Sequence, residues 1–171
     1  MTKNNYISIL LNVFFILIIG LFFLDFFTSF EIKNQLIKSL TFFGFLILSP
    51  VVLIWNFLTL KTIRKKIFAS ILPILSIITI LKISPTKIIF HSSAWKTQKI
   101  LYQNGHLNFN KVEFQMQDIG ALGYNKRTVE VIYLTDLFMI VKPVIDDINQ
   151  RVEWIKVNQE INELGIKPTI K

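Results

Sequence analysis

The chain has 171 residues, of which 52% are hydrophobic and 16 are phenylalanine, with no cysteine and a formal net charge of +8. A mean hydropathy of +0.51 is too high for a soluble protein of this size. It excludes an intrinsically disordered chain, a collagen-like repeat and a disulfide scaffold. The composition indicates a membrane protein.

The positive charge lies mainly in the first half of the chain. Residues 1–83 contain eight basic and two acidic residues, whereas residues 84–171 contain eleven and nine. The excess therefore belongs to loops between apolar segments, where basic residues set orientation in the membrane. Because the polar half is nearly neutral, the charge pattern argues against nucleic-acid binding.

Residues 7–24, ISILLNVFFILIIGLFFL, are the first predicted membrane span. At a rise of about 1.5 Å per residue they cover about 27 Å, close to the hydrocarbon thickness of a bilayer. The end of this run offers no small-residue cleavage site, which favours a retained span over a cleaved signal peptide.

Two further spans are predicted at residues 40–60 and 67–83. Pro50 lies within the second and is expected to kink it. In the third span, small or polar residues recur at every third position. This spacing allows close packing against a neighbouring helix; the alternative interpretation is that these residues line a polar conduit. These residues are Ser70, Pro73, Ser76 and Thr79.

The densest basic cluster predicts the orientation of these spans. It consists of Lys61, Arg64, Lys65 and Lys66, and the positive-inside rule places it in the cytoplasm. The N-terminus is then cytoplasmic, while the loop 31–39 and everything after Ser84 are extracytoplasmic. Four lysines close behind the third segment argue the other way, and if that segment is re-entrant, the polar domain is cytoplasmic. They are Lys82, Lys87, Lys96 and Lys99.

After Ser84 the sequence predicts a small α+β domain, residues 84–171, separate from the transmembrane bundle, residues 1–83. Alternating segments predict about five strands in an antiparallel sheet. They lie at 87–92, 97–103, 112–117 and 128–141, the last broken near Thr135-Asp136. A two-residue hairpin turn is predicted at Asn104-Gly105. The apolar Val112, Phe114 and Met116 are expected to form the buried face of their strand.

One C-terminal helix is predicted over residues 147–164, closing this sheet. Asp147 and Gln150 resemble a capping box, Gly165 can adopt the left-handed closing conformation, and Pro168 prevents continuation.

Asp25 is the one acid within an apolar run. An intramembrane carboxylate suggests a proton or cation site. The alternative is that Asp25 lies at the outer membrane interface, where it has no such role.

The most unusual stretch of the polar half is residues 115–127, QMQDIGALGYNKR. Its glycines allow positive φ and close backbone approach, so its amides and basic side chains suit an anion or a partner. The stretch lacks the GxxxxGK[ST] pattern of a phosphate-binding loop and the GxGxxG pattern of a dinucleotide-binding site. The alternative is a tight loop between two strands. The candidate ligand- or partner-binding residues are Asp118, Gly120, Gly123, Tyr124, Asn125, Lys126 and Arg127.

The sequence selects no catalytic residue, metal site or cofactor. The chain has no cysteine, and its two histidines, His91 and His106, lack the HExxH spacing of a zinc site. The G-x-S-x-G pattern of a nucleophilic serine is also absent.

The sequence therefore favours a non-enzymatic integral membrane protein that anchors a β-rich domain for docking a protein partner, such as an assembly or accessory factor of an envelope complex. One alternative is a membrane carrier or enzyme using Asp25 or the 118–127 loop; another is an immunity or stress-response membrane protein. The richness in Lys, Asn, Ile and Phe suggests a low-GC bacterium and hence its inner membrane. Homo-oligomer formation stays open.

Overall fold

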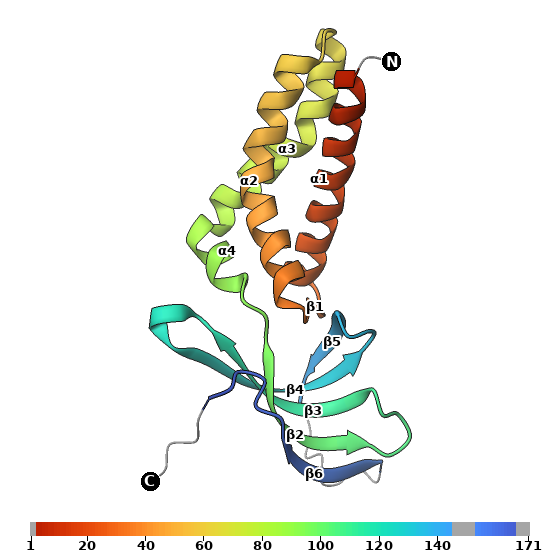
Figure 1. The fold of residues 1–171 in the computed structure, drawn as a ribbon, viewed down its shortest axis with the longest axis vertical. Helices are drawn as coiled ribbons and strands as arrows, with labels where there is room; N and C mark the ends of the chain where they lie inside the picture. Colours follow the sequence, from red (N-terminus) through yellow and green to blue (C-terminus); the bar gives the residue numbers. More distant parts are fainter. Residues whose placement is uncertain (1–2, 145–152, 167–171) are drawn as a thin grey trace. The chain divides into compact units, whose positions relative to one another are not determined.

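The computed structural model describes residues 3–144 and 153–166 (Figure 1). The chain divides into two compact units. The first, the helical unit, comprises residues 1–27 and 36–92, and the second, the β-domain, comprises residues 28–35 and 93–171.

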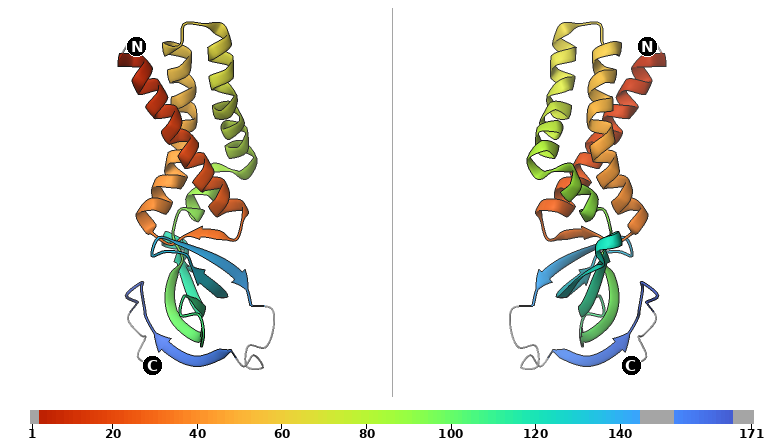
Figure 2. Two further views of the ribbon diagram at one scale, coloured as in Figure 1. Left: turned by 90° about the vertical axis from the view of Figure 1, so that its right-hand side faces the viewer. Right: turned by 90° about the vertical axis from the view of Figure 1, so that its left-hand side faces the viewer.

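Three long apolar helices form the helical unit: α1 (Lys3–Phe27), α2 (Gln35–Thr59) and α3 (Ile63–Ile83). Their candidate membrane spans, Tyr6–Phe27, Gln35–Thr59 and Ile63–Ile83, contain 22, 25 and 21 residues. Each is long enough to cross a bilayer, which confirms the three predicted segments. In Figure 2, α1 crosses α2, and α2 and α3 run side by side.

A short helix, α4 (Pro85–His91), follows α3. The strand predicted at residues 87–92 is therefore wrong. Pro85 occupies the first helical position, where its fixed φ favours a helix. The side chain of His91 is bonded through Nδ1 to the carbonyl of Lys87, four residues earlier, at 3.0 Å.

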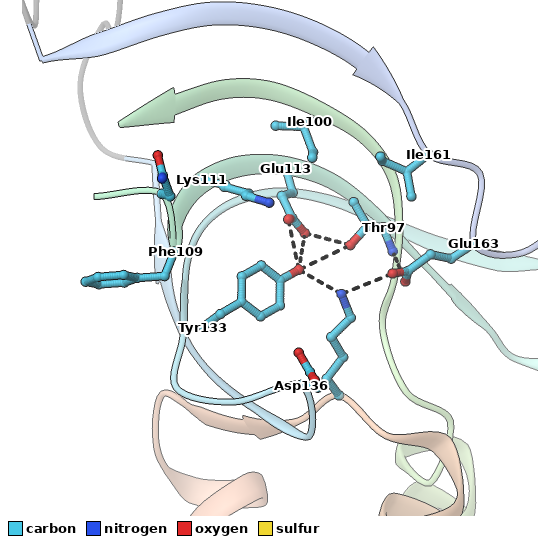
Figure 3. A pocket seen from close by; sticks show the side chains of 11 residues that line it. Thr97, Ile100, Phe109, Lys111, Glu113, Tyr133, Asp136, Ile161 and Glu163 are labelled. Carbon is cyan, nitrogen blue, oxygen red and sulfur yellow. Dashed lines mark hydrogen bonds and ion pairs between the residues drawn. The ribbon is translucent and has the colours of Figure 1, made fainter. Parts of the chain in front are cut away.

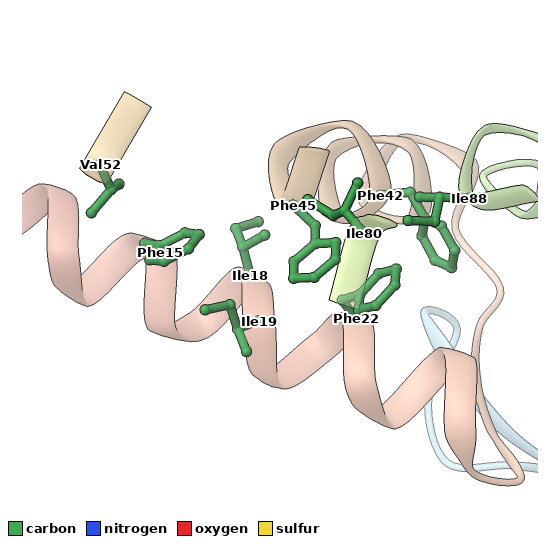
Figure 4. Packing of buried hydrophobic residues seen from close by; sticks show 9 residues of the cluster. All are labelled: Phe15, Ile18, Ile19, Phe22, Phe42, Phe45, Val52, Ile80 and Ile88. Atoms are coloured by element: carbon green, nitrogen blue, oxygen red, sulfur yellow. The ribbon is translucent and has the colours of Figure 1, made fainter. Parts of the chain in front are cut away.

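Aromatic packing joins α1 to α2 (Figure 4). The rings of Phe22 and Phe45 stack with centroids 3.9 Å apart. A Cβ atom at Gly44 would lie 3.4 Å from the side chain of Ile18, so the glycine allows the two helices to approach closely. The buried cluster comprises Phe15, Ile18, Ile19, Phe22, Phe42, Phe45, Val52, Ile80 and Ile88.

A buried asparagine links all three long helices. Asn12 of α1 and Asn56 of α2 exchange side-chain hydrogen bonds of 3.1 and 3.2 Å. Asn56 also donates to the carbonyl of Ala69 in α3 at 3.0 Å. On α3, Ser70, Pro73 and Ser76 are buried, in agreement with the predicted packing face.

The β-domain is built on one antiparallel sheet with strand order β1-β5-β4-β3-β2-β6. This confirms the predicted sheet, with six strands in place of about five. The strands are β1 (Phe30–Ile32), β2 (Lys96–Asn104), β3 (Asn110–Asp118), β4 (Tyr124–Tyr133), β5 (Phe138–Pro143) and β6 (Trp154–Glu160), with the 3-10 helix η1 (Gly120–Leu122) between β3 and β4.

The edge strand β1 comes from the loop between α1 and α2. It pairs with β5, with Phe30 opposite Ile140 and Ile32 opposite Phe138. The β-domain is thus assembled from two pieces of chain separated by α2, α3 and α4.

The C-terminal helix predicted over residues 147–164 is wrong in the described part of that range, because residues 154–160 form β6 and pair with β2. Residues 147–152 and Pro168 lie outside the described residues. Asn158 has a φ of 52°, close to a shift in register between Ile100 and Tyr102 of β2. Such a conformation fits a bulge and interrupts a helix. Gly165 has a φ of 66°, but in a turn after β6.

The two-residue hairpin predicted at Asn104-Gly105 is also wrong. A two-residue turn there would pair Tyr102 with Leu107, whereas Tyr102 pairs with Val112, so the loop is longer. The side-chain oxygen of Asn104 accepts hydrogen bonds from the backbone amides of His106 and Leu107. These two local hydrogen bonds stabilise a wider loop in place of a tight turn.

Candidate functional site

The buried face of β3 is polar. Glu113 and Gln115 have exposed fractions of 1% and 0%, and Gln117 is buried too, whereas Phe114 and Met116 are only half-buried. Val112 is buried as predicted, with 1% exposed, but the prediction that Phe114 and Met116 are buried with it is wrong. Because buried polar groups need hydrogen-bond partners, the surroundings of this row define the candidate site.

Glu113 lies at the centre of the site and accepts hydrogen bonds from three side chains, two of which, Thr97 and Tyr133, are drawn in Figure 3. The donors are the Thr97 hydroxyl at 2.7 Å, the Tyr133 hydroxyl at 2.8 and 2.9 Å, and the Gln115 amide at 3.0 Å. These bonds fix the carboxylate and replace the water lost on burial.

Lys33 extends this network across the sheet. Its ammonium donates to the Tyr133 hydroxyl at 2.9 Å and forms a 3.0 Å ion pair with Glu163. Lys33 follows the edge strand β1, and Glu163 follows the other edge strand, β6. The sheet must therefore curl until its two edges approach each other, which produces a concave interior.

Arg127 connects the polar row to β1. Its guanidinium donates two bonds to the Glu31 carboxylate, at 2.7 and 2.6 Å, and two to the Gln115 side-chain oxygen, at 3.0 and 2.8 Å. It also lies 3.9 Å from the centre of the Trp95 ring. Planar stacking and bidentate pairing together are specific to arginine.

A cavity of about 610 Å³ opens beside Tyr133, within the range typical of ligand sites. The Lys111 ammonium lies 5.8 Å from the Tyr133 ring centre, and Phe109 is exposed. The residues that line the cavity are Lys33, Thr97, Ile100, Asn108, Phe109, Lys111, Glu113, Tyr133, Asp136, Ile161 and Glu163.

Two groups of the network have altered acidity. Burial raises the pKa of the Tyr133 phenol, and the charge of Glu113 raises it further. Burial lowers the pKa of Lys33, but its interactions with Tyr133 and Glu163 outweigh this effect, so the pKa lies above its usual value. The folded β-domain therefore favours the neutral phenol and the charged ammonium.

The β-domain is expected to lose stability at alkaline pH. Both groups retain their protons in the folded state above the usual pKa values of 10.0 and 10.5, whereas the unfolded chain releases them there. Their contribution is complete below about pH 10 and declines as the pH rises through the folded pKa values. Thermal unfolding between about pH 8 and about pH 11.5 checks this. The Lys33→Met/Tyr133→Phe variant should show a flatter profile, and an equally steep one would contradict the assignment.

Asp25 forms an ion pair with Lys38 in the helical unit. The Asp25 carboxylate and the Lys38 ammonium are 3.1 Å apart, and both side chains are 4% exposed. The Lys38 ammonium also lies 5.7 Å from the Phe42 ring centre. This contact gives Asp25 a structural partner on α2.

Of the stretch singled out from the sequence, residues 118–127, Asp118 ends β3, residues 119–123 form the connection, and residues 124–127 begin β4. The Asp118 carboxylate accepts a 2.7 Å hydrogen bond from the Gly120 amide, and the amides of Ile119 and Gly123 donate within the loop. Gly120 and Gly123 have φ values of 67° and 92°. Asn125 donates to Gln117 at 3.2 Å. Anion or partner binding by this loop stays a prediction.

Among the described residues, no group of three or more His, Asp or Glu side chains could hold a metal ion. His91 packs against Phe26, with ring centroids 5.2 Å apart.

Sequence reasoning missed most of the site. Of the predicted candidates, Arg127 belongs to the network, whereas the cavity residues were not selected. The available signal was the alternation of Glu113, Gln115 and Gln117, which is equally typical of a solvent-exposed face. Comparisons of the chain with protein-family models, with curated proteins and with solved structures find no match.

Proposed function

We propose that this chain is a non-enzymatic membrane protein of a bacterial inner membrane whose extracytoplasmic β-domain docks a partner protein, as an accessory or assembly factor of an envelope complex. The observation that carries the proposal is the open cavity beside Tyr133. Three helices long and apolar enough to cross a membrane support the anchoring role.

The cavity offers contacts of the kind that protein interfaces use. Phe109 is 49% exposed, and neither Lys111 nor Asp136 forms an ion pair among the described residues. An aromatic anchor with one free cation and one free anion suits a peptide segment carrying both charges. The network beneath it is already held by internal hydrogen bonds, so the site is preorganised.

The pairing of β1 with β5 supports the proposed topology. β1 follows the first span and β5 follows the third, and both must lie on the same side of the membrane to pair. Three complete spans meet this requirement, whereas a re-entrant third segment does not. Basic residues between α2 and α3 then favour a cytoplasmic position for that loop, which leaves the β-domain outside.

The contacts of the alternative sites favour docking over transport. Asp25 is paired with Lys38, and Arg127 is paired with Glu31. A proton or anion site would need these groups to change partners. An immunity or stress-response role is compatible with the same docking cavity.

Site-specific photocrosslinking tests the proposal. A photoreactive phenylalanine analogue in place of Phe109 should crosslink one discrete partner in intact cells, and the native chain should copurify with the same partner stoichiometrically. The Lys111→Ala/Asp136→Ala variant should lose both signals while keeping its unfolding temperature. The same analogue at exposed Lys142, outside the cavity, is the control. Equal crosslinking at both positions, or none at Phe109, contradicts the proposal.

A further inference from the structure

Strand β6 (Trp154–Glu160) is an edge of the sheet, with β2 on one side and no strand of the described residues on the other (Figure 1). Both of its faces are uncovered, because every residue from Ile155 to Glu160 is exposed. Ile155 and Val157 are 59% and 40% exposed, although they are apolar. An edge of this length with exposed apolar side chains is a template for pairing with another strand.

The main chain of β6 has hydrogen-bonding groups directed away from β2. Just before β6, the Glu153 carbonyl accepts a 2.8 Å hydrogen bond from the loop that follows β2. Just after β6, the Ile161 amide donates one of 3.0 Å to a β2 carbonyl. Because the main-chain groups of successive strand residues point to opposite sides, those of Lys156 and Glu160 point to the open edge.

The side chains of Lys156 and Glu160 carry opposite charges on the same face of β6. Across β2 they align with Val112 and Phe114 of β3, which are two residues apart and therefore on one face. Both charged side chains are exposed, and neither forms an ion pair with a described residue.

An antiparallel copy of β6 complements this edge in charge. With a two-fold axis at Asn158, Lys156 of each copy lies opposite Glu160 of the other, where their main-chain groups exchange hydrogen bonds. The same register sets the exposed Ile155 opposite Ile161. Moving the axis by one residue in either direction sets Lys156 opposite an uncharged asparagine.

The conformation of Asn158 favours a second copy over an unrelated strand. Its φ is 52°, and it lies at the register shift between β6 and β2. A bulge at a sheet edge hinders pairing with a regular strand. Two copies of β6 place the same bulge at the same level on the axis, so the pairs on both sides of it stay in register.

We infer that β6 pairs with β6 of a second copy of this chain, which joins the two sheets into one across a two-fold axis. The pairing also extends the cavity beside Tyr133, because Ile161 lines that cavity (Figure 3) and the partner's Ile155 lies opposite it. The inference goes beyond the proposed docking of another protein and does not depend on it.

Single cysteines test the register, since the chain contains no cysteine. Full-length chains with Lys156→Cys and with Glu160→Cys carry different tags, are produced together, and are oxidised in their membranes with copper phenanthroline. Opposite residues have Cα atoms about 5.5 Å apart, within disulfide reach, whereas two copies of Lys156→Cys lie about 13 Å apart along the strand.

The mixed disulfide should exceed the disulfide between two copies of Lys156→Cys severalfold. Lys142→Cys, at an exposed position of β5, replaces Glu160→Cys in the control and should give no mixed disulfide. Equal yields of the mixed and the like disulfides, or no mixed disulfide, would overturn the inference.

Charge reversal tests the recognition between the copies. Lys156→Glu and Glu160→Lys should each lower the dimer fraction of the full-length chain severalfold, because like charges then lie opposite each other, and the two changes together should restore it. Stepwise photobleaching of fluorescently tagged chains in lipid vesicles counts the copies, and an unchanged unfolding temperature shows that the fold is kept. A monomeric native chain, or dimers that withstand either single reversal, would contradict this pairing.

Discussion

Replacing Asp25 by Asn is expected to lower the free energy of unfolding by about 3–5 kcal/mol, because it leaves a buried Lys38 ammonium without its carboxylate. The two groups are 3.1 Å apart and almost fully buried. Thermal unfolding in detergent micelles measures the effect. Removing only the Asp25 charge is damaging because the buried Lys38 ammonium still pays its desolvation penalty and has lost the carboxylate that offset it.

The double variant Asp25→Asn/Lys38→Met is expected to regain most of that stability, since neither buried charge remains. Lys82→Met removes an exposed lysine of α3 and should leave stability almost unchanged. If Asp25→Asn unfolds like the native chain but abolishes activity in cells, the ion pair is not structural and the carrier hypothesis gains support.

Replacing Arg127 by Ala is expected to destabilise the β-domain by about 3–5 kcal/mol. The substitution leaves the Glu31 carboxylate and the buried Gln115 oxygen without the guanidinium that holds both. It also removes the contact with Trp95. Tryptophan fluorescence during denaturant unfolding measures the loss.

The adjacent residue supplies a matched control, since Lys126 carries the same charge but is exposed. Lys126→Ala should change stability by less than about 0.5 kcal/mol. Arg127→Lys should recover only part of the loss, because an ammonium cannot form the bidentate pair. Similar losses for Lys126→Ala and Arg127→Ala would indicate that the basic pair acts through charge alone.

The function of Arg127 shows why the site was only partly predictable. Its charge and its place after a glycine-rich loop suggested an anion site, and the residue does bind a carboxylate. That carboxylate belongs to Glu31, 96 residues away in the chain. The sequence identifies a group that binds anions, but it does not identify its partner, because contact between β4 and the α1–α2 loop depends on how the whole sheet is assembled.

The sequence by itself determined the three apolar helices and the existence of an antiparallel sheet after them, because hydropathy over about 20 residues and local alternation depend only on near neighbours. Tertiary structure alone decided that β1 joins the sheet, that residues 154–160 form β6, and that Glu113 and Gln115 point inward. A strand gains stability only from a partner distant in sequence, and a glutamate becomes a core residue only where Thr97 and Tyr133 supply its hydrogen bonds.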